Sequence, residues 1–165
     1  MTSDTLSVLA ALAGARLKQG GHMLAAAESC TGGWVASSTV SIAGSSDWFD
    51  RGFVTYSNAA KREMLGVPAK TIEDHGAVSE PTARAMAEGA LAHSGASVAL
   101  AITGVAGPSG GSPDKPVGTV CFAWARRGGA ADALTRRFEG DRTEVRRQSV
   151  IFSLQGLIER LEPGK

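Results

Sequence analysis

A nearly continuous apolar run over residues 97–103 limits the folds open to this chain more than any other feature of its sequence. The run shows no alternation of polar and apolar residues, which is typical of a strand that is covered on both faces by helices. Such strands belong to the sheets of α/β proteins and lie near the middle of those sheets. The run therefore predicts an α/β domain with this strand in a central position.

Helical and strand patterns alternate along the rest of the chain. Apolar residues recur at helical spacing, or short helices are indicated, at residues 5–17, 34–42, 58–65, 69–74, 81–93 and 141–161. Further strands are expected at residues 23–27, 53–56, 117–125 and 133–138. The Gly128-Gly129 turn indicates that the last two strands are antiparallel. This order predicts a three-layer α/β/α sandwich with a mixed sheet of about five strands, and we expect residues 1–165 to form one domain.

The composition argues against several classes of protein. Lys and Arg number 17 against 16 Asp and Glu, a formal net charge of +1, so we expect no binding to nucleic acid. Cys30 and Cys121 lie far apart, and neither they nor the histidines have the spacing of a metal site. We see no secretory leader and no apolar stretch long enough to span a bilayer. A cytoplasmic protein without a metal, a cofactor or a membrane partner is therefore expected.

The segment Glu-Ser-Cys-Thr-Gly-Gly at residues 28–33 lies between a predicted strand and a predicted helix. Such a turn exposes side chains at the edge of the sheet where open α/β folds bind ligands, and its N–H groups can bind an anion or a developing oxyanion. Ser29 is the candidate nucleophile. The candidate substrate-binding residues of the segment are Glu28, Thr31, Gly32 and Gly33. On its own the motif is explained equally well by a helix start that Ser29 or Thr31 caps.

A base for Ser29 is available beyond the next strand. Tyr56, the only tyrosine of the chain, ends the predicted strand at residues 53–56, and Lys61 follows on the next helical turn. A hydroxyl nucleophile needs a base, and a desolvated lysine can serve as one. The three side chains would form a serine-tyrosine-lysine arrangement, although a solvated surface lysine is the alternative for Lys61. We expect the neighbouring Cys30 thiol to point into the core.

Two further segments are expected at the same edge. The central strand ends in Thr103 and Gly104 before a loop rich in Gly, Pro and Ser, so these residues would lie beside the nucleophile. A glycine-rich connection without a chemical role is the alternative. Asp141 has the features of a helix N-cap, and Arg142 behind it could bind a phosphate or carboxylate. The alternative for Arg142 is a surface arginine paired with Asp141 or Glu144.

Together these segments resemble the CinA C-terminal domain family. The match runs from about residue 6 to residue 161 and rests on the order and spacing of AESCTGG at 27–33, IAGSS at 42–46, GFVTYSN at 52–58, Lys61, GAVSEP at 76–81, TGVAGP at 103–108, KPVGTV at 115–120 and GDR at 140–142. Stand-alone members of this family are nicotinamide-nucleotide amidases. The resemblance therefore implies hydrolysis of nicotinamide mononucleotide to nicotinic acid mononucleotide and ammonia, in pyridine nucleotide salvage.

The resemblance also implies serine-lysine chemistry that needs no cofactor. By position this chemistry falls on Lys61 and a nearby serine, with Tyr56 beside them. Ser29 is one candidate, and Ser46, in the Gly-Ser-Ser segment that also matches the family, is the alternative nucleophile or substrate contact. Hydrolysis of another small amide fits the same residues, and a non-catalytic, competence-associated nucleotide-binding module is the alternative function. Helices rich in alanine and glycine also favour a homo-oligomer.

Overall fold

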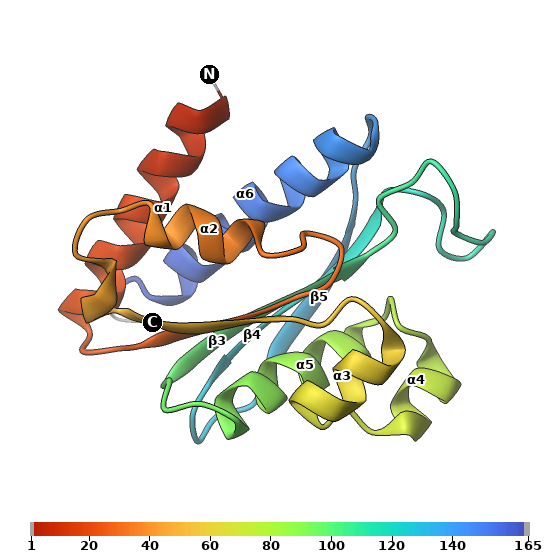
Figure 1. The fold of residues 1–165 in the computed structure, drawn as a ribbon, viewed down its shortest axis with the longest axis horizontal. Coiled ribbons are helices and arrows are strands. Elements are labelled where there is room, and N and C mark those ends of the chain that lie inside the picture. The colour runs from red at the N-terminus through yellow and green to blue at the C-terminus, as the bar shows by residue number, and fades with distance from the viewer. Residues whose placement is uncertain (1, 164–165) are drawn as a thin grey trace.

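The apolar run at residues 97–103 forms the middle strand of a five-stranded sheet in this computed structural model, which describes residues 2–163 (Figure 1). The strands are β1 Leu24–Glu28, β2 Phe49–Val54, β3 Val98–Gly104, β4 Thr119–Arg126 and β5 Asp132–Arg137, in the order β2-β1-β3-β4-β5. β2, β1 and β3 are parallel, whereas β4 and β5 each run antiparallel to the preceding strand in that order. The predicted mixed sheet is confirmed.

Helices cover both faces of the sheet, which confirms the predicted three layers (Figure 1). One layer contains α1 Thr2–Gln19, α2 Trp34–Val40 and α6 Arg142–Arg160. The other contains α3 Asn58–Leu65, α4 Ala69–His75 and α5 Glu80–Ala92. Within residues 2–163, no helix is both long enough and apolar enough to cross a bilayer.

The prediction for β2 is wrong in its bounds. The strand was expected at residues 53–56, but it runs from Phe49 to Val54, so Tyr56 lies in the loop that follows. β2 is an edge strand, and most of its residues are partly or fully exposed. An edge strand tolerates the polar Asp50-Arg51-Gly52 segment, which therefore gave no apolar signal.

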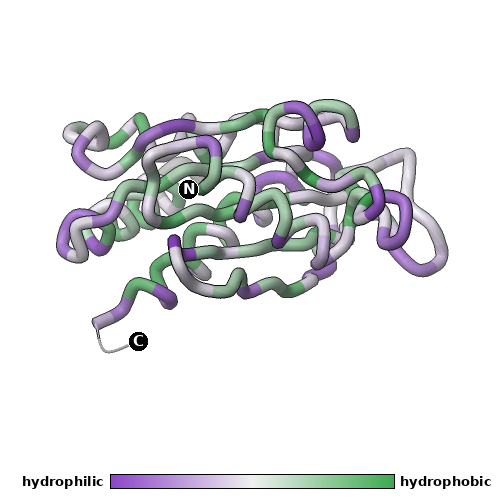
Figure 2. The backbone as a smooth tube through the Cα atoms, turned by 90° about the horizontal axis from the view of Figure 1, so that it is seen from below, coloured by the Kyte–Doolittle hydropathy of each residue, from purple (hydrophilic) through white to green (hydrophobic). Residues whose placement is uncertain are grey.

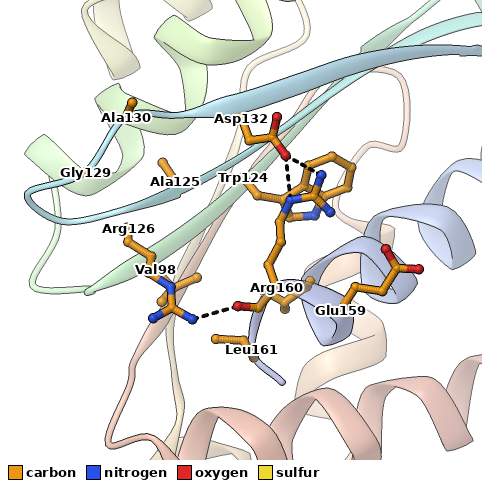
Figure 3. Close-up of a pocket in the computed structure, with 11 residues that line it drawn as sticks. Val98, Trp124, Ala125, Arg126, Gly129, Ala130, Asp132, Glu159, Arg160 and Leu161 are labelled. Atoms are coloured by element: carbon orange, nitrogen blue, oxygen red, sulfur yellow. Dashed lines mark hydrogen bonds and ion pairs between the residues drawn. The ribbon is translucent and has the colours of Figure 1, made fainter. Parts of the chain in front are cut away.

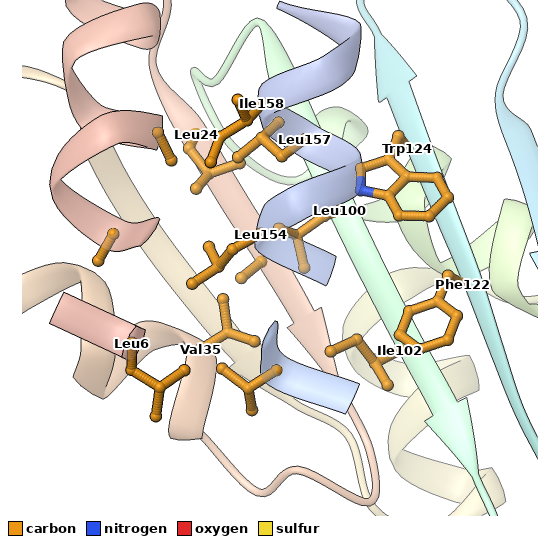
Figure 4. Close-up of a cluster of buried hydrophobic side chains, with 14 of the residues drawn as sticks. Leu6, Leu24, Val35, Leu100, Ile102, Phe122, Trp124, Leu154, Leu157 and Ile158 are labelled. Atoms are coloured by element: carbon orange, nitrogen blue, oxygen red, sulfur yellow. The ribbon is translucent and has the colours of Figure 1, made fainter. Parts of the chain in front are cut away.

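Different side chains fill the two layers on either side of the sheet. Alternate residues of β3 point to opposite faces, so Leu100 and Ile102 pack against α1 and α6 whereas Ala99 and Ala101 face α5. Figure 4 shows the larger side chains of the first layer around Leu154 of α6. In Figure 2 the hydrophobic stretches of the chain run through the middle of the molecule. The alanine face lets α5, and with it α3, lie close to the sheet.

The position of α3 depends on a close helix contact. Ser57 caps α3 by accepting a hydrogen bond from the amide of Ala60 at 3.0 Å. At the other end of α3, Gly89 of α5 packs against the backbone of Leu65, and a Cβ atom at this glycine would overlap the Leu65 carbonyl oxygen. Because α3 carries Lys61, this contact sets where the lysine enters the site.

Gly89→Ala is expected to destabilise the protein by about 1 kcal/mol. Overpacking a tight contact costs about 1–3 kcal/mol, which exceeds the roughly 1 kcal/mol that alanine gains over glycine in a helix. Urea unfolding measures the change. Gly95→Ala is the control, because no atom lies within 4 Å of a Cβ at Gly95. Equal stability of the two variants would contradict this account of the α3–α5 contact.

Candidate active site

Three parallel strands end together at the edge of the sheet that carries Ser29. The amide of Ser29 donates to the Ile102 carbonyl oxygen of β3 at 3.0 Å, and the amide of Thr55 donates to the Glu28 carbonyl oxygen of β1 at 2.8 Å. In the sheet Glu28 lies between Val54 and Ile102, and the residues that directly follow these three are Ser29, Thr55 and Thr103. The strand register therefore brings the ends of β1, β2 and β3 to one place, as the sequence predicted.

Lys61 reaches this edge from the first turns of α3. Its Nζ lies 3.1 Å from Ser29 Oγ, 3.2 Å from the Thr55 carbonyl oxygen and 3.1 Å from the Tyr56 carbonyl oxygen. The residue is only 1% exposed, and Ser29 is 6% exposed. The alternative of a solvated surface lysine is therefore wrong.

Burial lowers the pKa of Lys61 below the usual 10.5, with a small opposing effect from the Cys30 thiol. No ion pair among residues 2–163 includes Lys61. A neutral amine has two N–H groups and one lone pair. In the structure Lys61 Nζ donates to Ser29 Oγ, and the Ser29 hydroxyl donates to the Tyr56 carbonyl oxygen at 3.4 Å. Once Lys61 is neutral, the Thr55 and Tyr56 carbonyl oxygens can accept its two N–H groups, and its lone pair can accept the Ser29 hydroxyl proton. The geometry thus suits a neutral lysine that acts as a base.

The Glu28 carboxylate holds the turn from inside the protein. Its Oε1 accepts from Thr31 Oγ1 at 2.7 Å and from the amides of Gly33 and Val35 at 3.2 and 2.9 Å. Its Oε2 accepts from the amide of Ala36 at 3.0 Å. Glu28 and Thr31 are both fully buried. Their side chains face the start of α2 and not a ligand, so we assign them the role of shaping the turn.

The alternative of a helix start that Ser29 or Thr31 caps is wrong. The N-cap of α2 is Gly33, and neither Ser29 nor Thr31 makes the capping hydrogen bond. Gly32 and Gly33 have φ angles of 58° and 100°, a conformation that favours glycine.

Two amides of the turn already donate hydrogen bonds within it. The N–H groups of Gly32 and Gly33 donate within the turn, to a carbonyl and a carboxylate oxygen. In contrast, no backbone hydrogen bond to another described residue uses the N–H of Cys30 or Thr31. Thr31 is fully buried and Cys30 is only 5% exposed, so neither N–H lies open on the surface.

The Cys30 side chain points into the core, as predicted. It belongs to the cluster between the sheet, α1 and α6 and is 5% exposed. Burial raises the pKa of its thiol to about 11. A thiol in this state is not the nucleophile of the site.

Arg142 joins the site from the first turn of α6. Its guanidinium donates to the Gly107 carbonyl oxygen at 2.8 Å and lies 3.4 Å from the Tyr56 hydroxyl. Asp141 caps α6, as predicted, by accepting from the amide of Glu144 at 2.9 Å. Arg142 pairs with neither carboxylate, so that alternative is wrong. The Tyr56 phenol is 64% exposed and contacts Arg142, whereas its backbone carbonyl contacts Lys61.

Thr103 and Gly104 lie at the predicted edge, but their contacts are structural. The Thr103 hydroxyl donates to the Ala77 carbonyl oxygen at 2.8 Å and is buried, so it ties the segment before α5 to the sheet. Gly104 pairs with Val120 of β4, where a Cβ atom would meet the Val120 side chain.

Ser46 lies away from these residues. It is an exposed residue of the short helix Ser45–Asp47, which precedes β2. The next residue but one, Trp48, pairs through its carbonyl oxygen with the amide of Leu24 at the start of β1. Ser46 is therefore at the opposite edge of the sheet, and within one chain the structure does not bring it to Lys61.

The sequence analysis did not single out Arg146. Its Nε donates to the Cys30 carbonyl oxygen at 2.9 Å, and a terminal nitrogen donates to the Thr31 carbonyl oxygen at 3.2 Å. Its guanidinium also lies 5.5 Å from the ring centre of Trp34. The available signal was its spacing, since Arg146 follows Arg142 by one helical turn.

A separate pocket of about 550 Å³ lies at the opposite edge of the sheet (Figure 3). Arg160 crosses it with its Nε 3.0 Å from an Asp132 oxygen and its guanidinium 3.9 Å from the Trp124 ring centre. Arg126 donates to the Arg160 carbonyl oxygen. The charged groups of this pocket thus already bind one another. Among the described residues, no three His, Cys, Asp or Glu side chains gather as a metal site requires.

Comparisons with known proteins agree with this arrangement. The family model of the CinA C-terminal domain matches residues 6–161. The chain is 54% identical over 159 residues to the nicotinamide-nucleotide amidohydrolase PncC of Escherichia coli K12, with 95% of each chain covered. It is 52% identical over 155 residues to the protein of the same name from Enterobacter agglomerans, with 94% of each covered. Among solved structures, the competence/damage inducible protein CihA from Agrobacterium tumefaciens superposes with a TM-score of 0.92 at 46% identity, over 96% of each chain. This chain belongs to the CinA C-terminal domain family.

Proposed function

We propose that this chain is a nicotinamide-nucleotide amidohydrolase that converts nicotinamide mononucleotide and water to nicotinic acid mononucleotide and ammonia. The observation that carries the proposal is the buried Lys61 Nζ 3.1 Å from Ser29 Oγ. A serine next to a desolvated lysine is a nucleophile with its own base. The substrate class follows from the relatives named as nicotinamide-nucleotide amidohydrolases, which match nearly the whole chain.

The first half of the reaction forms an acyl-enzyme. Ser29 Oγ attacks the carboxamide carbon while its proton passes to neutral Lys61 Nζ. The Thr55 and Tyr56 carbonyl oxygens keep the lone pair directed at the hydroxyl. The Lys61 ammonium then protonates the departing nitrogen, the C–N bond breaks and ammonia leaves. Tyr56 thus acts through its backbone carbonyl oxygen and not through its phenol.

The second half restores the enzyme. Water attacks the ester carbon and gives a proton to Lys61, after which the bond to Ser29 Oγ breaks and the oxygen regains that proton. The product acid, whose carboxyl group now contains the oxygen of that water, then leaves. In both halves the oxyanion is stabilised by hydrogen-bond donors, each of which contributes about 3–4 kcal/mol in comparable sites.

Arg142 is the proposed clamp for the phosphate of the nucleotide. It begins α6, where the helix dipole already favours an anion, and its guanidinium has no carboxylate partner among residues 2–163. One terminal nitrogen is held by Gly107 and the other faces the exposed Tyr56 hydroxyl. Holding the phosphate at the far end of the substrate aims the carboxamide at Ser29.

Ser29→Ala and Lys61→Ala should each lower kcat for ammonia release from nicotinamide mononucleotide by at least about 10³-fold, because each removes half of one acid-base unit. The double variant should be about as slow as either single one. The measurement is ammonia release from about pH 6 to about pH 9, the range in which such acid-base pairs operate. A wild-type protein that releases no ammonia above the blank would reject the proposed function.

Ser46→Ala is the matched control for these variants, because it removes an exposed hydroxyl at the other edge of the sheet. We expect its kcat to stay within about twofold of the wild type, as for most surface changes. If Ser46→Ala were inactive and Ser29→Ala active, the nucleophile would be Ser46.

Arg142→Ala should lower kcat/KM for nicotinamide mononucleotide by about 10–100-fold, the equivalent of one lost charge-assisted contact. The rate on the dephosphorylated riboside should barely change, because that compound lacks the group that Arg142 binds. Arg147→Ala is the control, since Arg147 pairs with Glu144 instead. Equal losses on both substrates, or no loss on either, would contradict the clamp.

A further inference from the structure

A buried carboxylate lies one residue before the nucleophile and takes no part in the proton transfers. Glu28 is fully buried, and no ion pair in the described part of the chain includes it. A carboxylate that is removed from water without a cation is costly, unless hydrogen bonds replace those it made to water. An apolar side chain at this end of β1 would avoid the cost. The retained carboxylate therefore indicates a role that an apolar side chain cannot fill.

The sheet holds Ser29 on its N-terminal side only. The Glu28–Ser29 peptide group is bound at both ends. Its C=O accepts from the Thr55 amide at 2.8 Å, and its N–H donates to the Ile102 carbonyl oxygen at 3.0 Å. The carbonyl oxygen of Thr55 in turn accepts from Lys61 Nζ at 3.2 Å. Strand pairing thus fixes the backbone that leads into the nucleophile, together with one contact of its base.

The C-terminal side of Ser29 lies beyond the sheet and is held by the Glu28 side chain. The Ser29 carbonyl oxygen accepts from the Gly32 amide at 3.1 Å, so this residue also begins a tight turn. The Glu28 carboxylate binds the turn through the Thr31 hydroxyl, at 2.7 Å, and through one amide. It binds the first turn of α2 through two further amides, at 2.9 and 3.0 Å. Its two oxygens thus join the turn and α2 to the end of β1.

We propose that Glu28 is a positioning residue for the nucleophile, whose carboxylate fixes the far side of the turn and so keeps Ser29 Oγ within hydrogen-bond distance of Lys61 Nζ. This inference rests on the proposed function, because it concerns the serine that attacks the carboxamide. Glu28 faces α2 and acts through the backbone of Ser29. A displacement of about 1 Å in a reacting group can cost about 10²-fold in rate, so a small movement of the turn is enough.

Glu28→Gln tests the carboxylate with little change of shape. Three donors meet Oε1, and the Ala36 amide meets Oε2. In either orientation the glutamine NH₂ would therefore face at least one donor, and the start of α2 is expected to move away from it. We expect kcat for nicotinamide mononucleotide to fall about 10²-fold, with KM within about twofold, because the substrate contacts are kept.

A second readout follows the nucleophile itself, as the rate at which a fluorophosphonate modifies Ser29, located by peptide mass spectrometry. This rate should fall in parallel with kcat in Glu28→Gln. Thr31→Val, which removes one donor to the carboxylate, should lower both rates about tenfold, and Thr31→Ser, which keeps the hydroxyl, should lose less. These two variants decide the question if Glu28→Gln does not fold.

Gly156→Ala is the control for a general loss of stability. A Cβ atom at Gly156 would overlap the Trp124 ring, at the opposite edge of the sheet from Ser29, so the variant should have a lower melting temperature. Its kcat and its labelling rate at 25 °C should stay within about twofold of the wild type, because the folded protein keeps its site. Melting temperatures are measured for every variant.

Two results from the variants would overturn the inference. One is unchanged kcat and labelling in Thr31→Val and in a folded Glu28→Gln. The other is a loss of both rates that Gly156→Ala reproduces at a similar melting temperature. A wild-type protein that neither releases ammonia nor is labelled would overturn this inference and the proposed function together. A wild-type protein that is labelled but releases no ammonia would reject only the proposed substrate, and slower labelling of Glu28→Gln and Thr31→Val would still support the role of Glu28.

Discussion

The burial of the Lys61 amine is the constraint on which the rest of the site depends. Removing an ammonium group from water is costly, so a buried lysine either finds a counter-ion or loses its proton. Lys61 has three oxygen partners and no ion pair among residues 2–163. Burial thus lowers the pKa of Lys61 and makes the ammonium easier to deprotonate, and two fixed carbonyls hold the nitrogen beside Ser29. The same burial that makes the Lys61 ammonium costly for the fold also lowers its pKa, and a lower pKa lets the lysine act as a base.

The surrounding structure serves to keep this pair in register. Parallel pairing of three strands places Ser29 beside Thr55 at the ends of the strands. The contact of Gly89 with α3 fixes the position of Lys61 relative to them. The turn itself is held from two sides, by the Glu28 carboxylate from within the protein and by Arg146 from α6. Because both anchors bind the backbone, they orient amide groups without occupying the space that a substrate needs.

Much of the fold and part of the site follow from local patterns in the sequence. The apolar run at residues 97–103 and the spacing of the helices reflect burial, which depends mainly on each segment's own residues. Ser29 and Lys61 were predictable as a pair because the ends of parallel strands meet at one edge. The direction in which the Glu28 side chain points was not predictable, because β1 is buried on both faces and its sequence shows no alternation of polar and apolar residues. The contacts of Arg146 depend on the tilt of α6, which no local pattern encodes. Cytoplasmic location and a homo-oligomer stay predictions.

The central claim is that Lys61 is neutral when it meets the Ser29 hydroxyl, and NMR titration of the isotope-labelled lysine side chain tests it most directly. The account predicts a midpoint below the 10.5 of an ordinary lysine, because burial disfavours the charged form. It also predicts that kcat/KM falls as the pH drops through this midpoint, since a protonated amine has no lone pair to accept the hydroxyl proton. A Lys61 that titrates near 10.5, or activity that does not change across its titration, would contradict the account.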